Sequence, residues 1–161
     1  MMSEKIEKVL FNTTPVVKVR VINNDDSKEL KEQKQLFPFI LENDVIVTVQ
    51  TSERKFSFKI GQNYVWNGAD IPRLFWRIIG SKTDNAFLTA SLVHDYMLQF
   101  KKFIFEEVLK KDMKLYDYRK LTSLIFREIV KQCGTGTIKA NIMSWCVDTF
   151  QHFCNRGQWK L

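Results

Sequence analysis

The apolar residues of this chain change their spacing near the segment 64–73. Before this segment they alternate with polar residues, as in half-buried strands, and after it they recur at the three- and four-residue intervals of amphipathic helices. Strands followed by helices predict an α+β fold. We expect a small antiparallel sheet from the N-terminal half, with about four helices from the C-terminal half packed on one face.

The length of the chain predicts a single domain. Its 161 residues fall within the range of about 100 to 200 residues that one hydrophobic core serves. We divide residues 1–161 into an N-terminal strand with an exposed polar loop, a β-hairpin region, and a motif turn with a helical region. These three regions cover residues 1–35, 36–66 and 67–161.

The clearest strand signal is a hairpin. Residues 45–50 and 55–60 alternate apolar and polar side chains on either side of a polar connection, so one face of each strand is expected to point inward. Residues 64–66 resume an extended pattern before Asn67 and Gly68 interrupt it.

Two weaker strand signals precede the hairpin. Residues 16–22 alternate valine with basic side chains, which favours a half-buried strand. Residues 36–41 contain Pro38, and we expect an edge strand or a strand with a bulge there because proline cannot donate a ladder hydrogen bond. Residues 23–35 are polar and predict an exposed loop or a short surface helix.

Four segments after the turn have helical spacing. They span residues 73–79, 85–100, 117–133 and 137–153. The segment 81–84 and Asp117 are predicted to cap the second and third helices. The second helix carries little polarity, so we expect it to be central. The last helix is expected to bury an apolar stripe that includes Ile138, Ile142 and Cys146.

The net charge limits the classes of partner. The chain carries a formal charge of +7 and has a sequence pI near 9.3, which favours encounters with nucleic acid, an anionic surface or an acidic protein. Basic residues between positions 101 and 120 are interrupted by acids. That mixture also fits an ordinary solvated surface.

The cysteine count and the hydropathy pattern exclude other classes. Three cysteines without a CxxC pair do not form a zinc cage or a disulfide framework. No secretory signal is visible, and no apolar run approaches the roughly 18 residues that a membrane helix requires. We therefore expect no membrane insertion and a start in the cytoplasm.

The turn at residues 67–73 combines Asn67, Gly68, Asp70 and Arg73, with Pro72 at a predicted helix start. Polar side chains beside the unpaired N–H groups of a first helical turn bind an anion or orient a carboxylate. A purely structural interpretation is also open, in which Asn67 and Gly68 form a turn and Asp70 caps the helix.

The dipeptide His94-Asp95 lies in the apolar second helix. A carboxylate there costs several kcal/mol unless it is paired or bound, and Arg73 is the expected partner of Asp95. A His-Asp pair resembles part of the metal site of HD-type phosphohydrolases, which needs further histidines and aspartates. His152 is the only other histidine, so a buried structural network remains the alternative.

Two segments together carry a resemblance to a known family. Residues 67–76, Asn-Gly-Ala-Asp-Ile-Pro-Arg-Leu-Phe-Trp, and residues 94–98, His-Asp-Tyr-Met-Leu, resemble an uncharacterised small domain family of tailed bacteriophages and prophages. Members of that family carry a Gly-Ala-Ser-Ile-Pro-Arg-like turn after a β segment and a His-Asp-Tyr-Leu-like helix. The resemblance covers residues 36–153 and implies a phage setting.

The chain departs from the family pattern in the turn and in a later helix. Asn67 stands where the family has aspartate, and Asp70 stands where it has serine. A later helix of the family reads Arg-x-x-Ala-Asp-x-x-Phe. Arg119 and Phe126 match this pattern, whereas Ser123 replaces its aspartate. An acid that the family would use for metal binding is therefore absent at position 123.

These observations leave two functional hypotheses. The first is a non-catalytic phage protein, a virion component or a binder of a phage or host protein or of nucleic acid, with Asn67, Gly68, Arg73 and Arg119 in its binding network. It requires no cofactor and would act in the host cytoplasm or packaged in the virion.

The second is a hydrolase-like site in which Asp70, His94 and Asp95 converge. His94 would then act as a general base or, with Asp95, as a ligand of a divalent metal.

Overall fold

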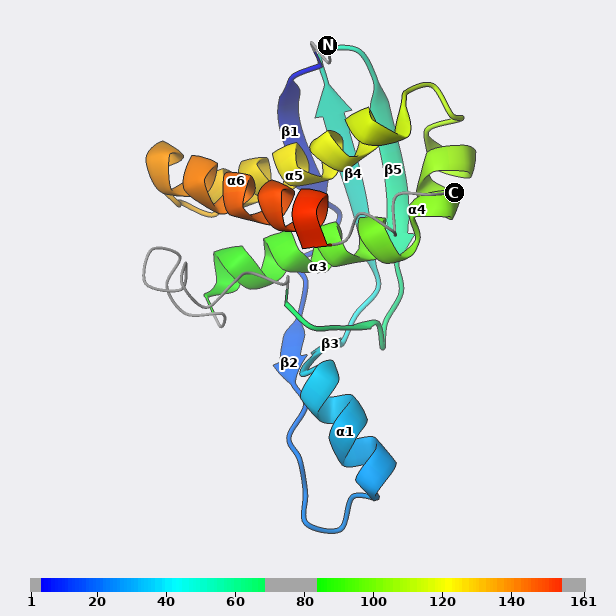
Figure 1. The fold of residues 1–161 in the computed structure, drawn as a ribbon, viewed down its shortest axis with the longest axis vertical. Helices are drawn as coiled ribbons and strands as arrows, with labels where there is room; N and C mark the ends of the chain where they lie inside the picture. Colours follow the sequence, from blue (N-terminus) through cyan, green and yellow to red (C-terminus); the bar gives the residue numbers. More distant parts are fainter. Residues whose placement is uncertain (1–3, 69–83, 155–161) are drawn as a thin grey trace.

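The computed structural model describes residues 4–68 and 84–154. Strands come first and helices follow, so the α+β prediction is confirmed (Figure 1). The predicted helix at residues 73–79 lies outside the described residues. In chain order the described elements are β1 (Ile6–Phe11), β2 (Val17–Val19), α1 (Lys28–Leu36), β3 (Phe39–Leu41), β4 (Val45–Thr51), β5 (Lys55–Ile60), β6 (Val65–Trp66), α3 (Asn85–Gln99), α4 (Lys101–Phe103), the π-helical η2 (Ile104–Val108), α5 (Leu115–Gln132) and α6 (Thr137–Cys154).

The predicted hairpin is the centre of an antiparallel sheet with the strand order β1-β4-β5. Val47 lies opposite Phe58 and Val49 opposite Phe56, and all four side chains are buried. The alternate residues of both strands face outward, so one face of this sheet meets the core and the other meets solvent.

Sequence analysis missed β1. Its pairing with β4 shifts register between Ile6 and Lys8, which places the buried residues at Ile6 and Val9 rather than at alternate positions. A β-bulge of this kind breaks the two-residue period from which strands are predicted. The Gln132 side chain on α5 bonds both backbone groups of Val9, at 3.1 Å each.

The remaining strands form a second antiparallel sheet, β2-β3-β6, where we expected one sheet in all. The edge-strand prediction for residues 36–41 is wrong because β3 is the middle strand. Pro38 precedes β3 and uses only its carbonyl, which accepts a hydrogen bond from the Arg20 N–H at 2.7 Å. The chain leaves this sheet at Asn43 and Asp44, whose side chains accept bonds from the backbone N–H groups of Val16 and Gln62.

The described helices of the C-terminal half cover one face of the β1-β4-β5 sheet, as expected (Figure 1). Helix α3 begins where Asp84 accepts a bond from the Ala86 N–H at 2.9 Å, and most of its residues are buried. The central position that we predicted for α3 is taken by α5, which contacts α3, α6 and β1. The cap of α5 is Lys114 rather than the predicted Asp117, and the helix ends beside Gly134 at φ +94°. Ile138 on α6 is 79% exposed, so the predicted stripe is wrong at that residue.

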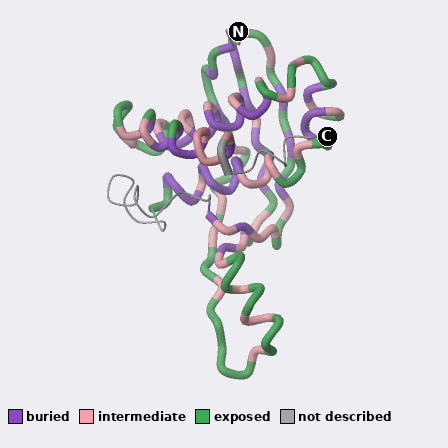
Figure 2. The backbone as a smooth tube through the Cα atoms, in the orientation of Figure 1, coloured by how far each residue is buried: buried purple, intermediate pink, exposed green. Residues whose placement is uncertain are grey.

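Residues 16–38 form an arm, which includes β2 and α1 and projects from the body of the molecule (Figure 1). The polar segment forms a short surface helix, one of the two structures expected there. Its cap Ser27 accepts a bond from the Leu30 N–H at 3.2 Å, and no residue of α1 is buried. Figure 2 shows this contrast between an exposed arm and a buried body.

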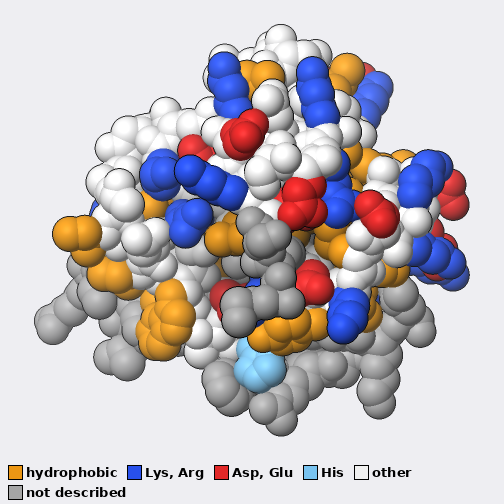
Figure 3. Space-filling model, turned by 90° about the horizontal axis from the view of Figure 1, so that it is seen from above, with side chains coloured by type: hydrophobic (Ala, Val, Ile, Leu, Met, Phe, Trp, Pro, Cys, Tyr) orange, Lys and Arg blue, Asp and Glu red, His pale blue; other side chains and the backbone are white. Residues whose placement is uncertain are grey.

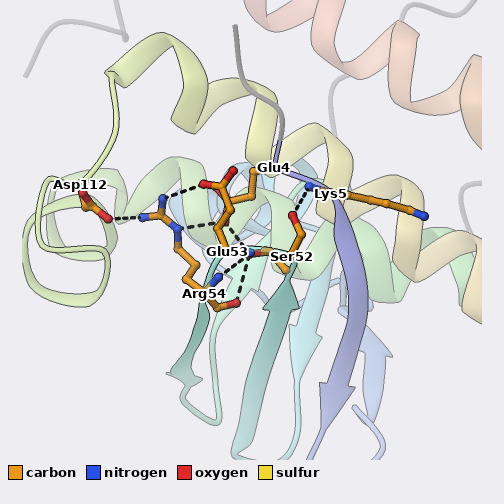
Figure 4. A network of polar contacts seen from close by, with 7 residues as sticks. Glu4, Lys5, Ser52, Glu53, Arg54 and Asp112 are labelled. Atoms are coloured by element: carbon orange, nitrogen blue, oxygen red, sulfur yellow. Dashed lines mark hydrogen bonds and ion pairs between the residues drawn. The ribbon is translucent and has the colours of Figure 1, made fainter.

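A polar network joins the N-terminal segment to the hairpin (Figure 4). The buried Glu4 carboxylate accepts bonds from the Arg54 Nε at 2.9 Å and from the Thr51 hydroxyl at 2.6 Å. Arg54 also donates to Asp112 at 3.0 Å, so the network reaches the segment after η2. In the part of the chain that the structure describes, no helix combines the length and hydrophobicity needed to cross a membrane.

Candidate functional site

The His94 side chain lies within the interior, on a helix that buries most of its residues. It is 1% exposed, and its ring packs edge-on to Phe126 of α5 with 5.9 Å between ring centroids. The Nδ1 atom lies 3.3 Å from Asp95 Oδ1. The Nε2 atom is buried and has no hydrogen-bond partner among the described residues. His94 therefore has one ring nitrogen beside a carboxylate and one without a hydrogen-bond partner among the described residues.

Asp95 lies nearer the surface than His94. Its side chain is 15% exposed. Burial is the main cause that raises the pKa of the Tyr64 hydroxyl, and the negative charge of the nearby Asp95 raises this pKa further. The Tyr64 hydroxyl donates to the Gln99 side chain at 3.0 Å. Tyr96 stacks on Phe58 with 5.8 Å between ring centroids. Within the His-Asp-Tyr motif, Tyr96 thus packs against the β1-β4-β5 sheet, whereas His94 packs against α5.

The turn is joined to α3 through Trp66. The buried indole N–H of Trp66 donates to the Ser91 hydroxyl at 3.1 Å, and Ser91 donates in turn to the Leu88 carbonyl at 3.0 Å. Gly68 follows at φ +83°, and a Cβ atom there would lie 2.6 Å from the Phe39 ring. Glycine is required at this position by conformation and by space.

Of the other residues predicted in the turn, only Asn67 is among the described residues. Asn67 directly follows β6 and is half-buried, whereas Asp70 and Arg73 lie outside the described residues. The convergence of Asp70 with His94 and Asp95, and the pairing of Arg73 with Asp95, remain predictions. Among the described residues, no three His, Cys, Asp or Glu side chains are grouped as metal ligands would be.

Arg119 is buried and lies in a separate polar cluster between α5 and α6. Its guanidinium donates to the Asp148 carboxylate at 2.6 Å and to the Asp148 carbonyl at 2.8 Å. The Ser123 hydroxyl lies 3.4 Å from the same carboxylate. In the bacteriophage family pattern an acid stands on α5 at the position of Ser123. Here the Asp148 carboxylate of α6 lies beside Ser123 instead. Sequence analysis missed Asp148 because nothing local marks it.

A comparison with protein families identifies the central part of the chain. The family described as "Protein of unknown function (DUF1353)" matches residues 40–147. The chain belongs to the DUF1353 family. The match includes β4, β5, β6, α3, α5 and most of α6.

One curated relative shares a short segment with this DUF1353 protein. It is the uncharacterized protein y4jT of Sinorhizobium fredii, 49% identical over 35 residues, which are 22% of this chain and 10% of the relative. The matched segment thus spans about a tenth of the length of that relative. No solved structure matches the chain.

The limits of the DUF1353 match separate the candidate site from the arm. His94, Asp95 and Arg119 lie inside residues 40–147, as does the turn, whereas Asp148 lies one residue beyond this range. Strand β1, strand β2 and helix α1 lie outside it. The arm is therefore an addition to the region that defines the family.

Proposed function

We propose that this DUF1353 protein is a non-catalytic, macromolecule-binding protein of a tailed bacteriophage or prophage, in which the polar network of His94, Asp95, Asp70 and Arg73 is structural. The observation that carries the proposal is the enclosure of His94, which is 1% exposed and packed against Phe126. A general base must reach the proton that it removes. A side chain enclosed to this degree suits packing between α3 and α5 better than contact with a substrate.

The phage setting rests on the motif resemblance of residues 67–76 and 94–98. In that setting the protein acts in the host cytoplasm or is packaged in the virion. Its partner is a phage or host protein, another virion subunit or nucleic acid, and the charge of +7 favours an acidic surface on that partner. Binding of this kind requires no cofactor.

One observation favours a second candidate function, a metal-dependent hydrolase. His94 Nε2 is buried without a hydrogen-bond partner among the described residues, and buried polar atoms ordinarily have one. In a metal-binding histidine, one ring nitrogen binds the metal and the other contacts a carboxylate, which fixes the orientation of the ring. The contact between His94 Nδ1 and Asp95 fits this arrangement. In this alternative His94 and Asp95 hold a divalent cation and Asp70 completes the site.

Metal content separates the two functions. The purified full-length chain is analysed by elemental mass spectrometry after expression with zinc, manganese and iron present. The binding-protein proposal expects substoichiometric metal in the wild type. A divalent metal bound in a 1:1 ratio, and lost in both His94→Ala and Asp95→Asn, would establish the hydrolase candidate instead.

The stability of the same variants tests the structural role. Removing the enclosed imidazole leaves a cavity beside Phe126, and we expect His94→Ala to lower the free energy of unfolding by about 2–4 kcal/mol. His152→Ala, at the only other histidine, is the matched control and is expected to change it by less than about 1 kcal/mol. Equal effects of the two substitutions would contradict the structural role.

A further inference from the structure

The surface where α5 and α6 lie side by side contains a pocket of about 300 Å³. Its lining includes Lys120, Ser123 and Arg127 from α5 and Asn141, Trp145 and Asp148 from α6. On each helix these residues recur at three- and four-residue intervals, so they form two facing stripes. The α5 stripe continues to Tyr116, and from Tyr116 to Arg127 it is about 16 Å long at the rise of an α-helix.

Two cations of this pocket have no acidic partner. Neighbouring basic residues of α5 are paired, Arg119 with Asp148 and Lys131 with Glu128. Lys120 and Arg127 form no ion pair with any described residue. The Arg127 Nε atom is buried and has no hydrogen-bond partner in the described part of the chain. A buried guanidinium nitrogen without an acceptor is costly, so an acceptor from a ligand would satisfy it.

Aromatic side chains lie beside these cations. The Lys120 ammonium lies 4.8 Å from the centre of the Tyr116 ring, an attraction that positions the ammonium without neutralising it. Trp145 lines the pocket and is 60% exposed, so part of its indole faces solvent at the pocket. The one carboxylate of the pocket, Asp148, is already paired with Arg119 at 2.6 Å, so it offsets Arg119 rather than Lys120 or Arg127.

We propose that this α5–α6 pocket binds single-stranded nucleic acid, with Lys120 and Arg127 on phosphate groups, Trp145 stacked on a base and Asn141 as a hydrogen-bonding group. Unpaired cations beside an exposed aromatic ring are the combination by which proteins bind single strands without sequence preference. The net charge of +7 assists the approach of a polyanion. On the face drawn in Figure 3, Lys and Arg side chains are interspersed with acidic and hydrophobic ones, so overall charge alone does not mark a binding site. This inference rests on the proposed binding function and names its partner.

The test is fluorescence anisotropy with a labelled 20-nucleotide single strand and a duplex of equal length, titrated with full-length protein over a range of salt concentrations. We expect binding of the single strand, with at least about a 10-fold preference over the duplex, because a paired base offers no face to Trp145. The double variant Lys120→Gln/Arg127→Gln is expected to weaken binding at least about 10-fold. It should also reduce the salt slope by about 1.4, since each single-strand phosphate contact contributes about 0.7.

The matched control is Lys18→Gln/Lys59→Gln. It removes the same formal charge from two exposed lysines that are paired with Glu42 and Asp44, and it is expected to weaken binding less than about 2-fold. Trp145→Ala should weaken binding about 10-fold and Trp145→Phe should retain most of the affinity. Asn141→Asp, at an exposed position, places a carboxylate in the pocket and keeps the test valid if the cation variants fold poorly.

The inference would be overturned by no binding of the single strand at low salt, by equal losses in the pocket and control double variants, or by equal affinity for the duplex. Tight binding of labelled polyglutamate with the same dependence on Lys120 and Arg127 would also overturn it, in favour of an acidic protein partner. The proposed function fails separately, on the metal content and stability of the His94 and Asp95 variants. The two failures are therefore distinguishable.

Discussion

The body and the arm of this protein are held together by different forces. In the body, side chains such as Phe126, Trp66 and Tyr118 are at most 1% exposed and belong to one continuous hydrophobic cluster. In the arm, α1 buries no residue, and its contacts to the rest of the arm are polar. Lys34 bonds Asp26 at 2.6 Å and the Val21 carbonyl at 2.9 Å.

This difference indicates which part of the molecule contributes most to the free energy of unfolding. Apolar burial stabilises a fold by roughly 25 cal/mol per Å². The Lys34–Asp26 pair of the arm joins side chains that are 14% and 10% exposed, and the cost of desolvating such a pair offsets much of its attraction. The body carries the DUF1353 match and the candidate sites, and the arm lies outside that match. We therefore expect substitutions in the body to change global stability and substitutions in the arm to act locally.

The largest effect is expected at Phe126. Replacement by alanine removes a fully buried ring that contacts Phe87 and His94, and such cavities cost about 3–5 kcal/mol. Leu36→Ala in the arm, at a residue 66% exposed, should change the free energy of unfolding by less than about 0.5 kcal/mol. Urea denaturation followed by circular dichroism measures both, and similar losses would end the distinction between body and arm.

The next largest effect is expected for Gly68→Ala, which should lower the free energy of unfolding by about 2–4 kcal/mol. The substitution adds the strain of a positive φ and a Cβ 2.6 Å from the Phe39 ring. Two other glycines separate these causes, since Gly134 has φ +94° in open space and Gly61 has open space without a positive φ. Thermal unfolding of the three variants should rank the losses as Gly68, Gly134 and Gly61. A loss at Gly134 equal to that at Gly68 would assign the whole effect to backbone strain.

Arg54→Ala tests the polar network of Figure 4. It leaves the Glu4 carboxylate, 3% exposed, without its cation, and we expect a loss of about 2 kcal/mol. Lys18→Ala breaks a pair whose side chains are 67% and 43% exposed and should cost less than about 0.5 kcal/mol. Chemical denaturation at two salt concentrations measures both. An Arg54 effect as small as that of Lys18 would show that Glu4 is solvated.

Alkaline pH should destabilise the body through Tyr118. Burial raises the pKa of this hydroxyl, which donates to the Met97 carbonyl at 2.6 Å. The unfolded chain releases the proton near pH 10 and the folded chain retains it, so stability is complete below pH 10 and falls as pH rises, by about 1.4 kcal/mol per pH unit. Tyr118→Phe should reduce this slope in denaturation measured from pH 8 to 11. An unchanged slope would place the titration elsewhere, since burial also raises the pKa values of Tyr64 and Tyr96.

The smallest global effect is expected for Ser27→Ala. Loss of the cap bond to the Leu30 N–H should destabilise α1 locally by about 1 kcal/mol and leave the main unfolding transition unchanged. Hydrogen exchange of the α1 amides measures the local effect. A shift of the main transition by the full amount would show that α1 unfolds together with the body.

Much of the fold was predictable because its signals are local. The hairpin β4–β5 follows from strict alternation, and α3 follows from an apolar run that begins at an aspartate cap. The bulge in β1 hid that strand by breaking its period. Pro38 suggested an edge strand, but it precedes β3 and leaves the ladder of that strand intact. The predicted role of Ile138 failed because α6 turns Ala140 and Met143 inward instead.

The candidate site was predictable only in part. The sequence by itself determined that Gly68 forms a turn and that His94 lies on an apolar helix, because backbone conformation and burial depend on nearby residues. Only the tertiary structure decided that His94 packs on Phe126, that the strands divide into two sheets, and that Asp148 of α6 comes to Arg119 and Ser123 of α5. The side-chain contacts of His94 and Asp148 join residues 25 or more positions apart, and packing of whole elements against one another sets them. The residues next to a position in the sequence do not indicate which distant residue it will contact.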